Sequence, residues 1–239
     1  MDHQGVPNTQ LIKEHFDIAD IYKNQSIAEQ NSVDLAWALL MEDNFKDLRK
    51  TICGTSEEKT RFRQLVVNVV LATDICDAEL KKLRNGRWAK AFSGEKAMTP
   101  EQRNDDINRK ATIVLEHLIQ ASDVAHTMQH WHIYRKWNEL FFQENMNAYT
   151  SGRCDKDPTL YWYEGELGFF DYYIIPLAKK LKDCGVFGVS SEEYLNYATS
   201  NRKEWALQGK EVVAQMAAKY LPTLTEDHDE DASEEDGSS

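Results

Sequence analysis

The chain has 239 residues, 41% of them hydrophobic, which is enough to bury one substantial core and predicts a single folded domain. Its mean hydropathy is −0.62, and no apolar run approaches the roughly 18 residues of a spanning helix, so direct membrane insertion is not expected. Four widely spaced cysteines without a Cys-x-x-Cys pair indicate neither a disulfide scaffold nor a zinc ribbon.

The formal net charge of −12 is concentrated at the C-terminus. Eight acids lie between residues 226 and 236, and removing them from the total leaves −4 for the rest of the chain. A segment this acidic has too little apolar surface to bury, so burial cannot offset the entropy that ordering would cost. We therefore expect residues 222–239 to form an acidic disordered tail. The acidic balance gives no indication of a nucleic-acid partner.

Apolar residues recur at three- and four-residue spacing and strand-like alternation is scarce, so the sequence predicts an all-α fold. Thr99 is expected to cap a helix with Pro100 at its first position. On that helix we expect an inward-facing set of apolar side chains: Ile107, Val114, Leu115 and Leu118. The predicted helices, in chain order, cover residues 27–48, 61–83, 99–122, 128–149, 161–182 with a bend near Pro176, and 191–220 with an end near Pro222.

One acid stands out in the largely apolar run 114–126 (VLEHLIQASDVAH). A carboxylate buried there would be costly unless it were paired or bound to a metal. The alternative for Asp123 is a helix-end residue that caps the next segment. From the residues alone, both interpretations stay open.

Three further segments carry polar residues with chemical potential. Residues 1–8 read MDHQGVPN, residues 26–32 read SIAEQNS, and residues 70–74 read VLATD. A bare Asp2-His3 pair has little specificity by itself. Glu29 could be an ordinary first-turn acid favoured by the helix dipole, and Thr73 and Asp74 could be helix-interior polar residues that face solvent.

The last segment, residues 165–177, reads GELGFFDYYIIPL. It combines an acid, Glu166, with an aromatic residue, Phe169, one helical turn later. An aromatic residue at helical spacing is most often part of a core.

In this order, the five segments resemble the catalytic domain of class I 3′,5′-cyclic nucleotide phosphodiesterases. The family motifs are the second half of His-Asp-x-Asp-His-x-Gly-x-x-Asn for residues 1–8, Ser-x-x-Glu for 26–32, Leu-Ala-Thr-Asp for 71–74, Ala-Asp-x-Ser-Asn-Pro near Asp123, and Gln-x-Gly-Phe-x-Asp-x-x-x-x-Pro-Leu for 166–177. Several departures, including Gln120 in place of a motif His, indicate a divergent branch similar to those of protists or algae.

The resemblance implies a compact multi-helix catalytic domain of the HD type over residues 1–221. It assigns roles to nine residues. His3 and Glu29 would be catalytic through the metal-bridging water, and Asp123 would be a metal ligand. Asp2, Thr73 and Asp74 would support the metals and their waters, and the substrate would be bound by Glu166, Phe169 and His126.

The resemblance also implies a reaction, the hydrolysis of cyclic GMP, cyclic AMP or both to 5′-monophosphates in signal transduction. Its cofactors would be two divalent ions, zinc and then magnesium or manganese. Family motifs place Glu166 where a purine-selecting Gln is usual and His126 where an Asn is usual. Because an ionised carboxylate only accepts hydrogen bonds and guanine offers two donors, we hypothesise a preference for cyclic GMP, which protonation of Glu166 would weaken.

Three of the four family metal ligands and the general-acid His would precede residue 1, together with the N-terminal helices. We therefore expect the isolated chain to be inactive and to hold no stoichiometric zinc. The alternative function is a catalytically inactive, truncated helical module for protein interaction. We expect a cytoplasmic location, or the cytosolic side of a membrane through another part of the parent protein. A homo-oligomer and additional parent domains stay open.

Overall fold

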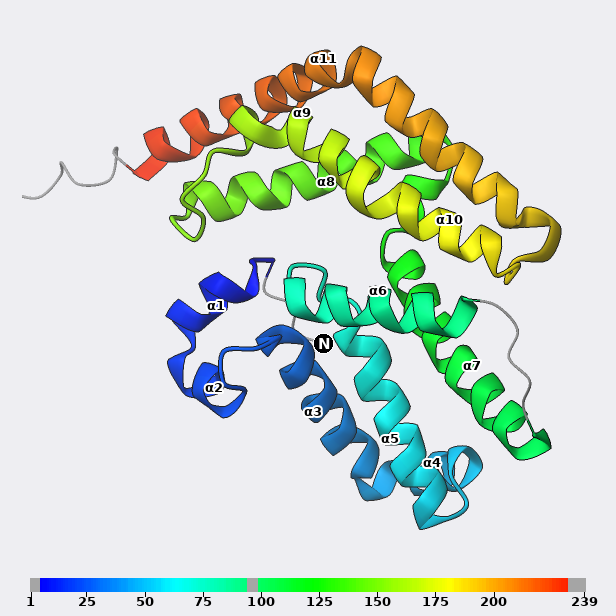
Figure 1. The fold of residues 1–239 in the computed structure, drawn as a ribbon. Coiled ribbons are helices and arrows are strands. Elements are labelled where there is room, and N and C mark those ends of the chain that lie inside the picture. The colour runs from blue at the N-terminus through cyan, green and yellow to red at the C-terminus, as the bar shows by residue number, and fades with distance from the viewer. Residues whose placement is uncertain (1–4, 94–98, 232–239) are drawn as a thin grey trace, which may run out of the picture. The chain divides into compact units, whose positions relative to one another are not determined.

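The computed structural model describes residues 5–93 and 99–231, without the side chains of Phe16 and of residues 221–231. Within these residues the secondary structure is helical and contains no strand, which confirms the predicted all-α class (Figure 1). The chain divides into two compact units, residues 1–124 and 125–239.

The first unit consists of helices joined by short loops. They are α1 (Asn8–Glu14), α2 (Phe16–Ile21), α3 (Ile27–Met41), the 3-10 turn η1 (Asp43–Phe45), α4 (Lys46–Ile52), α5 (Ser56–Leu71), α6 (Ala78–Phe92) and α7 (Pro100–Asp123). Two predicted helices are therefore interrupted. The one expected over 27–48 ends at Met41, and the one expected over 61–83 is divided by a loop after Leu71. The Asp77 carboxylate accepts from the backbone N–H groups of Glu79 and Leu80, which starts a new helix there.

Helix α7 begins as predicted. The Thr99 hydroxyl accepts from the Gln102 backbone N–H, the Gln102 side chain accepts from the Thr99 N–H, and Pro100 occupies the first turn. Helix α5 has a second capping box, made by Thr55 and Glu58. Local sequence signals thus fix the starts of both long helices of this unit.

The buried face of α7 differs from the expected one. Ile107 and Leu115 are 56% and 41% exposed, so their predicted inward orientation is wrong. The buried positions of α7 are Ile113, Glu116, His117, Gln120 and Ala121. The apolar pattern predicted the wrong face because polar side chains that have hydrogen-bond partners can be buried in place of apolar ones.

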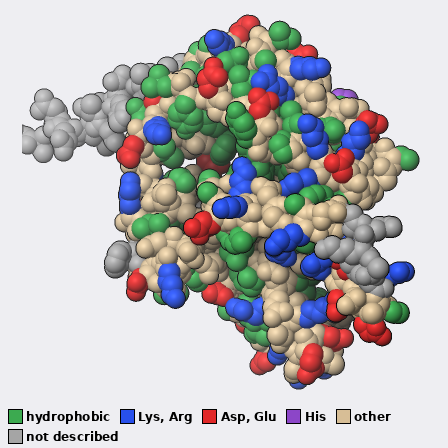
Figure 2. Space-filling model, viewed as in Figure 1, with side chains coloured by type: hydrophobic (Ala, Val, Ile, Leu, Met, Phe, Trp, Pro, Cys, Tyr) green, Lys and Arg blue, Asp and Glu red, His purple; other side chains and the backbone are tan. Residues whose placement is uncertain are grey.

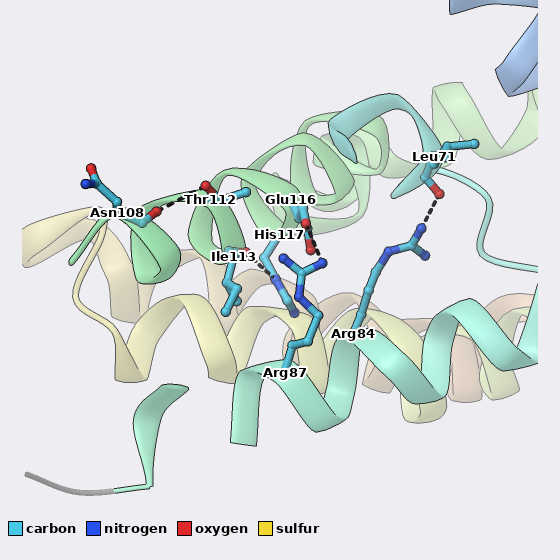
Figure 3. Close-up of polar contacts among 8 residues, drawn as sticks. All are labelled: Leu71, Arg84, Arg87, Asn108, Thr112, Ile113, Glu116 and His117. Atoms are coloured by element: carbon cyan, nitrogen blue, oxygen red, sulfur yellow. Dashed lines mark hydrogen bonds and ion pairs between the residues drawn. The ribbon is translucent and has the colours of Figure 1, made fainter. Parts of the chain in front are cut away.

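Helix α6 supplies the partner of Glu116, whereas the His117 ring bonds the Ile113 carbonyl of its own helix, as Figure 3 shows. Arg87 reaches the Glu116 carboxylate at 2.9 Å, from Nη1 to Oε1. The Trp88 ring lies 4.4 Å from the His117 ring, centroid to centroid, and Arg84 donates to the carbonyl of Leu71 at the end of α5. This polar layer connects α5, α6 and α7.

The second unit has an aromatic core. Its elements are η2 (Ala125–Met128), α8 (Trp131–Thr150), α9 (Pro158–Phe169), the π-helical segment η3 (Phe170–Ile174), α10 (Ile175–Asp183), η4 (Gly188–Ser190) and α11 (Ser191–Asp231). Helix α11 packs along α8, α9 and α10 (Figure 1). The largest side chains without solvent exposure are Tyr134, Phe142, Phe170 and Trp205.

The bend that we predicted near Pro176 coincides with η3. Proline has no N–H to donate within a helix, and the wider π turn immediately before Ile175–Asp183 accommodates this loss. Helix α11 runs to Asp231, so the end that we expected near Pro222 is wrong. A helix can continue past a proline with a local kink. Residues 232–239 of the expected tail lie outside the described residues.

The visible surface carries acidic and basic side chains in close alternation, with apolar side chains between them (Figure 2). None of the helices in the described part of the chain is long and apolar enough to cross a membrane. All four cysteines are free thiols.

Candidate functional site

In the first unit, the Asp74 carboxylate is the centre of a polar cluster. It lies in the loop after α5 and is only 6% exposed. Oδ2 accepts from the Ser26 hydroxyl at 2.7 Å and from the Asn8 amide at 3.3 Å. Oδ1 accepts from the backbone N–H groups of Cys76 and Asp77, at 3.1 and 3.2 Å. Asp74 is therefore neither in a helix interior nor facing solvent, and both of its oxygens accept hydrogen bonds.

Asn8 brings the predicted segments together. Its Nδ2 donates to Glu29 Oε2 at 3.0 Å as well as to Asp74, and its Oδ1 accepts from the Ala28 backbone N–H at 3.0 Å. Glu29 is in the first turn of α3. Residues that the sequence analysis took from three distant motifs thus share one hydrogen-bonded cluster.

Ser26 and Gln120 are the other two residues that contact the loop around Asp74. Ser26 has a left-handed backbone, with φ of 39°, which costs energy for a residue other than glycine. The Gln120 amide donates to the Ala72 carbonyl at 2.9 Å and so fixes α7 to the loop. Thr73 stays outside the cluster, because its hydroxyl donates to the Val70 carbonyl at 2.7 Å.

Asp123 is the last residue of α7, and its side chain is exposed. The expectation of a buried carboxylate there is wrong because the helix ends at this residue and the chain turns. Its metal-binding role stays a prediction. Asp2 and His3 lie outside the described residues. Among residues 5–93 and 99–231, no group of three or more His, Cys, Asp or Glu side chains is arranged to hold a metal ion.

In the second unit, Glu166 on α9 is 8% exposed and ends a chain of hydrogen bonds. Trp162 Nε1 donates to Asn138 Oδ1 at 3.2 Å. Asn138 Nδ2 is 3.4 Å from the Tyr134 hydroxyl, which donates to Glu166 Oε2 at 2.6 Å. These four residues, on α8 and α9, are called the Glu166 relay below.

Burial dominates the electrostatics of the relay. It raises the pKa of Glu166 from 4.5 to about 7, against the opposing effect of the Tyr134 and Asn138 hydrogen bonds. Burial and, next, the nearby Glu166 charge raise the pKa of Tyr134 well above 10. The tyrosine therefore stays protonated at neutral pH and donates its proton, whereas burial favours the protonated form of the glutamate.

The two other predicted substrate residues lie in the same unit. Phe169 is half-buried, one turn beyond Glu166, with its ring nearly parallel to that of Tyr173 at 5.4 Å. The neighbouring Phe170 is the aromatic residue in the core. His126 lies on η2 with its ring parallel to that of Tyr134 at 6.4 Å, and burial lowers its pKa. The three predicted substrate residues thus lie in one unit, on η2 and α9.

Comparison with known proteins adds to this geometry. The family model described as 3′5′-cyclic nucleotide phosphodiesterase matches residues 1–186. The chain belongs to the 3′5′-cyclic nucleotide phosphodiesterase family. The match includes both the Asp74 cluster and the Glu166 relay.

Similar curated members of this phosphodiesterase family come from animals. The chain is 26% identical over 216 residues to the probable 3′,5′-cyclic-AMP phosphodiesterase pde-4 of Caenorhabditis elegans, which covers 86% of the chain and 30% of that protein. It is 27% identical over 216 residues to 3′,5′-cyclic-AMP phosphodiesterase 4C of Rattus norvegicus, covering 86% of the chain and 38% of that protein. The chain thus spans about a third of the length of these relatives.

Solved phosphodiesterase domains share the fold. The phosphodiesterase domain of the RhoPDE fusion protein from the choanoflagellate Salpingoeca rosetta aligns with a TM-score of 0.68 and 20% identity, over 90% of this chain and 66% of that domain. A second structure of the rhodopsin phosphodiesterase domain from the same organism gives 0.67 and 20%, over 92% and 65%. This likeness confirms the fold class.

Sequence reasoning missed Ser26, Asn138 and Trp162 as parts of these clusters. Ser26 belongs to the Ser-x-x-Glu segment, and a serine directly before a helix is a recognisable signal. Asn138 and Trp162 are polar groups at apolar helix positions, separated by 24 residues in the sequence. No local pattern connects them, so only the packing of α8 against α9 shows their contact.

Proposed function

We propose that the protein to which this chain belongs hydrolyses 3′,5′-cyclic nucleotides to 5′-monophosphates, and that this chain provides the purine-binding residues. The observation that carries the proposal is the family match over residues 1–186, which includes the segments of Glu29, Asp74, Asp123 and Glu166. Cyclic AMP is a substrate to test first, because the similar curated proteins are named for it.

The base-binding part is supported by the second unit. Glu166 presents a carboxyl group one helical turn before the half-buried ring of Phe169, an arrangement suited to one hydrogen bond to a purine edge and one stacking contact. His126, kept neutral by burial, is a third polar contact for the nucleotide. Phosphate chemistry is not part of this unit's proposed role.

The metal-dependent part rests on resemblance. Members of the family use metal ions; we propose zinc and then magnesium or manganese in the complete domain, with Asp123 as the ligand from this chain. Such ions supply positive charge and an activated water to phosphoester hydrolysis. Within this chain, Asn8 orients the Glu29 carboxylate and holds it beside Asp74. Glu29 is therefore the acceptor that we propose for the reacting water.

The test uses the protein produced from its natural gene, with any sequence that the gene places before Met1. We expect metal-dependent conversion of cyclic AMP or cyclic GMP to the 5′-monophosphate, measured by chromatography. Asp123→Ala should lower kcat/KM by about a hundredfold or more, whereas Asp105→Ala, which removes another exposed acid of α7, should leave it unchanged.

Absence of both hydrolysis and cyclic nucleotide binding in the natural protein, with native helix content by circular dichroism, would overturn the proposal. Equal activity of Asp123→Ala and Asp105→Ala would remove Asp123 from the site and leave the family function intact.

A further inference from the structure

A cavity of about 240 Å³ lies in the first unit, where the end of α3, helix α4 and the start of α5 meet (Figure 1). Part of its wall is apolar and aromatic, and includes Trp37, Met41 and Phe62. The charged side chains among the described residues that line it are all basic: Lys46, Arg49, Lys50 and Lys59. In a chain with a net charge of −12, a cavity lined by cations alone favours an anionic ligand.

The aromatic wall of the cavity is held in place by its neighbours. The rings of Trp37 and Phe62 lie 6.2 Å apart, centroid to centroid. The Arg63 guanidinium lies 5.7 Å from the centre of the Trp37 ring and is itself paired with Asp34 at 3.2 Å. Both rings are partly exposed. They therefore offer a fixed surface on which a flat apolar group can pack.

Arg49 is the cation whose position is fixed by hydrogen bonds. Its Nη1 group donates to the backbone carbonyls of Leu40 and Glu42, at the end of α3. Among the described residues, its Nε and Nη2 groups have no partner. A guanidinium offers donors in a planar fork that matches the oxygens of a phosphate. Arg49 thus places unused donors at the cavity without further ordering of its side chain.

The acids close to the cavity in the sequence leave its lysines available. Glu58 is engaged in the capping box of α5 and lines a separate groove. Asp47 is 3.8 Å from Lys50, but both side chains are highly exposed, and such a pair contributes little. Lys46 and Lys59 are exposed and have no ion-pair partner among the described residues. The positive charge of the cavity is therefore largely uncompensated.

We propose that this cavity binds a small aromatic phosphate monoester. The aromatic body packs against Trp37 and Phe62, and the phosphate contacts the Arg49 guanidinium, with Lys46 and Lys59 beside it. Four cations suit a doubly charged group better than a singly charged one. The volume lies below the roughly 300 Å³ at which pockets for drug-sized ligands begin, so the ligand is small.

The cavity is separate from the Asp74 cluster. Glu29 is in the first turn of α3, whereas Met41 is the last residue of that helix. A rise of roughly 1.5 Å per residue places these two positions about 18 Å apart along the helix axis. A ligand in the cavity therefore does not occupy the site of the proposed function.

The test measures the dissociation constant of 1-naphthyl phosphate by isothermal calorimetry, on the protein made from its natural gene. The comparison ligands are 1-naphthol, which lacks the charge, and inorganic phosphate, which lacks the ring. We expect 1-naphthyl phosphate to bind at least about tenfold more tightly than either, the worth of one hydrogen bond to a charged group. Added salt should weaken its binding.

Two double variants assign the binding to the cavity. Lys46→Gln combined with Lys59→Gln removes two exposed cations and leaves Arg49 in place. It should raise the dissociation constant on the order of tenfold, the worth of two exposed ion pairs. The matched control is Lys81→Gln combined with Lys82→Gln, which removes two exposed lysines of α6 and should leave the constant unchanged.

Cys53 provides a second measurement, because this free thiol lines the cavity and is partly exposed. Saturating 1-naphthyl phosphate should slow the alkylation of Cys53 by iodoacetamide severalfold, measured by mass spectrometry of its peptide. Cys154, a partly exposed free thiol of the second unit, is the internal control and should react at an unchanged rate.

Tight binding of 1-naphthyl phosphate that the Lys46 and Lys59 substitutions weaken, with protection of Cys53, supports the inference. Binding that leaves Cys53 unprotected, or that is equal in the two double variants, takes place elsewhere and overturns it. Equal binding of 1-naphthol or of inorganic phosphate also overturns it, as does the absence of any binding. None of these results bears on hydrolysis of cyclic nucleotides, so the proposed function is tested separately.

Discussion

Asp74 in the first unit and Glu166 in the second are both buried carboxyl groups, yet their surroundings differ. Asp74 accepts hydrogen bonds from two side chains and two backbone N–H groups. Glu166 accepts a short hydrogen bond from Tyr134, and Asn138 also favours its ionised form, yet burial raises its pKa to about 7. The two buried carboxyl groups therefore differ in the number of donors aimed at them.

The packing around the two acids differs in the same sense. Glu166 lies beside a core of fully buried aromatic side chains, including Tyr134 and Trp205. The described core of the first unit is made of smaller side chains, among them Ala19, Ile27, Val33 and Ala72. The aromatic core supplies the desolvation that makes Glu166 titratable.

The largest expected effect is the dependence of stability on pH that Glu166 causes, which tests the contrast between the two acids directly. The pKa of Glu166 is about 7 in the folded chain against 4.5 for the ordinary group. The folded state thus binds the Glu166 proton more tightly than the unfolded state does. The stability that this proton contributes is therefore lost as the pH rises from about 4.5 to 7. Glu166→Gln should gain up to about 3 kcal/mol over the natural chain at pH 8 and little at pH 4.5, measured by urea unfolding.

The control for that prediction is Glu164→Gln, which removes an exposed acid of the same helix. It should change stability by less than roughly 0.5 kcal/mol at both pH values. A pH-independent effect of Glu166→Gln would contradict a raised pKa.

Removal of the Asp74 carboxylate tests the other side of the comparison. Asp74→Ala leaves the Ser26 hydroxyl and the loop N–H groups without their acceptor, so it should cost about 2–3 kcal/mol at neutral pH. Ser26→Ala, which removes one of these donors, should cost about 1 kcal/mol. Chemical denaturation of both variants gives the values, and a neutral Asp74→Ala would show that the cluster is not a structural anchor.

The packing contrast is tested by two glycines inside helices. A Cβ on Gly209 of α11 would lie 2.9 Å from ring atoms of Trp205 and Tyr163, whereas one on Gly86 of α6 would meet nothing within 4 Å. Gly209→Ala should destabilise by about 1–3 kcal/mol through overpacking. Gly86→Ala should stabilise by about 0.5–1 kcal/mol through reduced backbone entropy. Thermal unfolding with equal signs for both would contradict the account.

The smallest effects should be equal in the two units. Thr99 caps α7 in the first unit, and Asp157 caps α9 in the second by accepting from the Thr159 backbone N–H. Thr99→Ala and Asp157→Ala should each cost about 1 kcal/mol. A clear difference between the denaturation midpoints of the two variants would contradict this expectation. It would mean that the two units differ in how much their helix caps contribute to stability, and not only in tertiary packing.

Helix starts and the fold class were predictable because they depend on local signals such as Thr99-Pro100. The face of α7 was not, because Glu116 is buried through Arg87, 29 residues away in the sequence. The same reason limits the site. Glu29, Asp74 and Glu166 were recognisable from motifs, but the contacts that hold them come from Asn8, Tyr134 and Asn138 on other helices.

The most direct measurement for the central claim is the titration of the Glu166 side-chain carboxyl by ¹³C NMR, with the signal assigned by its loss in Glu166→Gln. The account predicts an apparent pKa of about 7 and a higher one in Tyr134→Phe. An ordinary value near 4.5, unmoved by Tyr134→Phe, would contradict it.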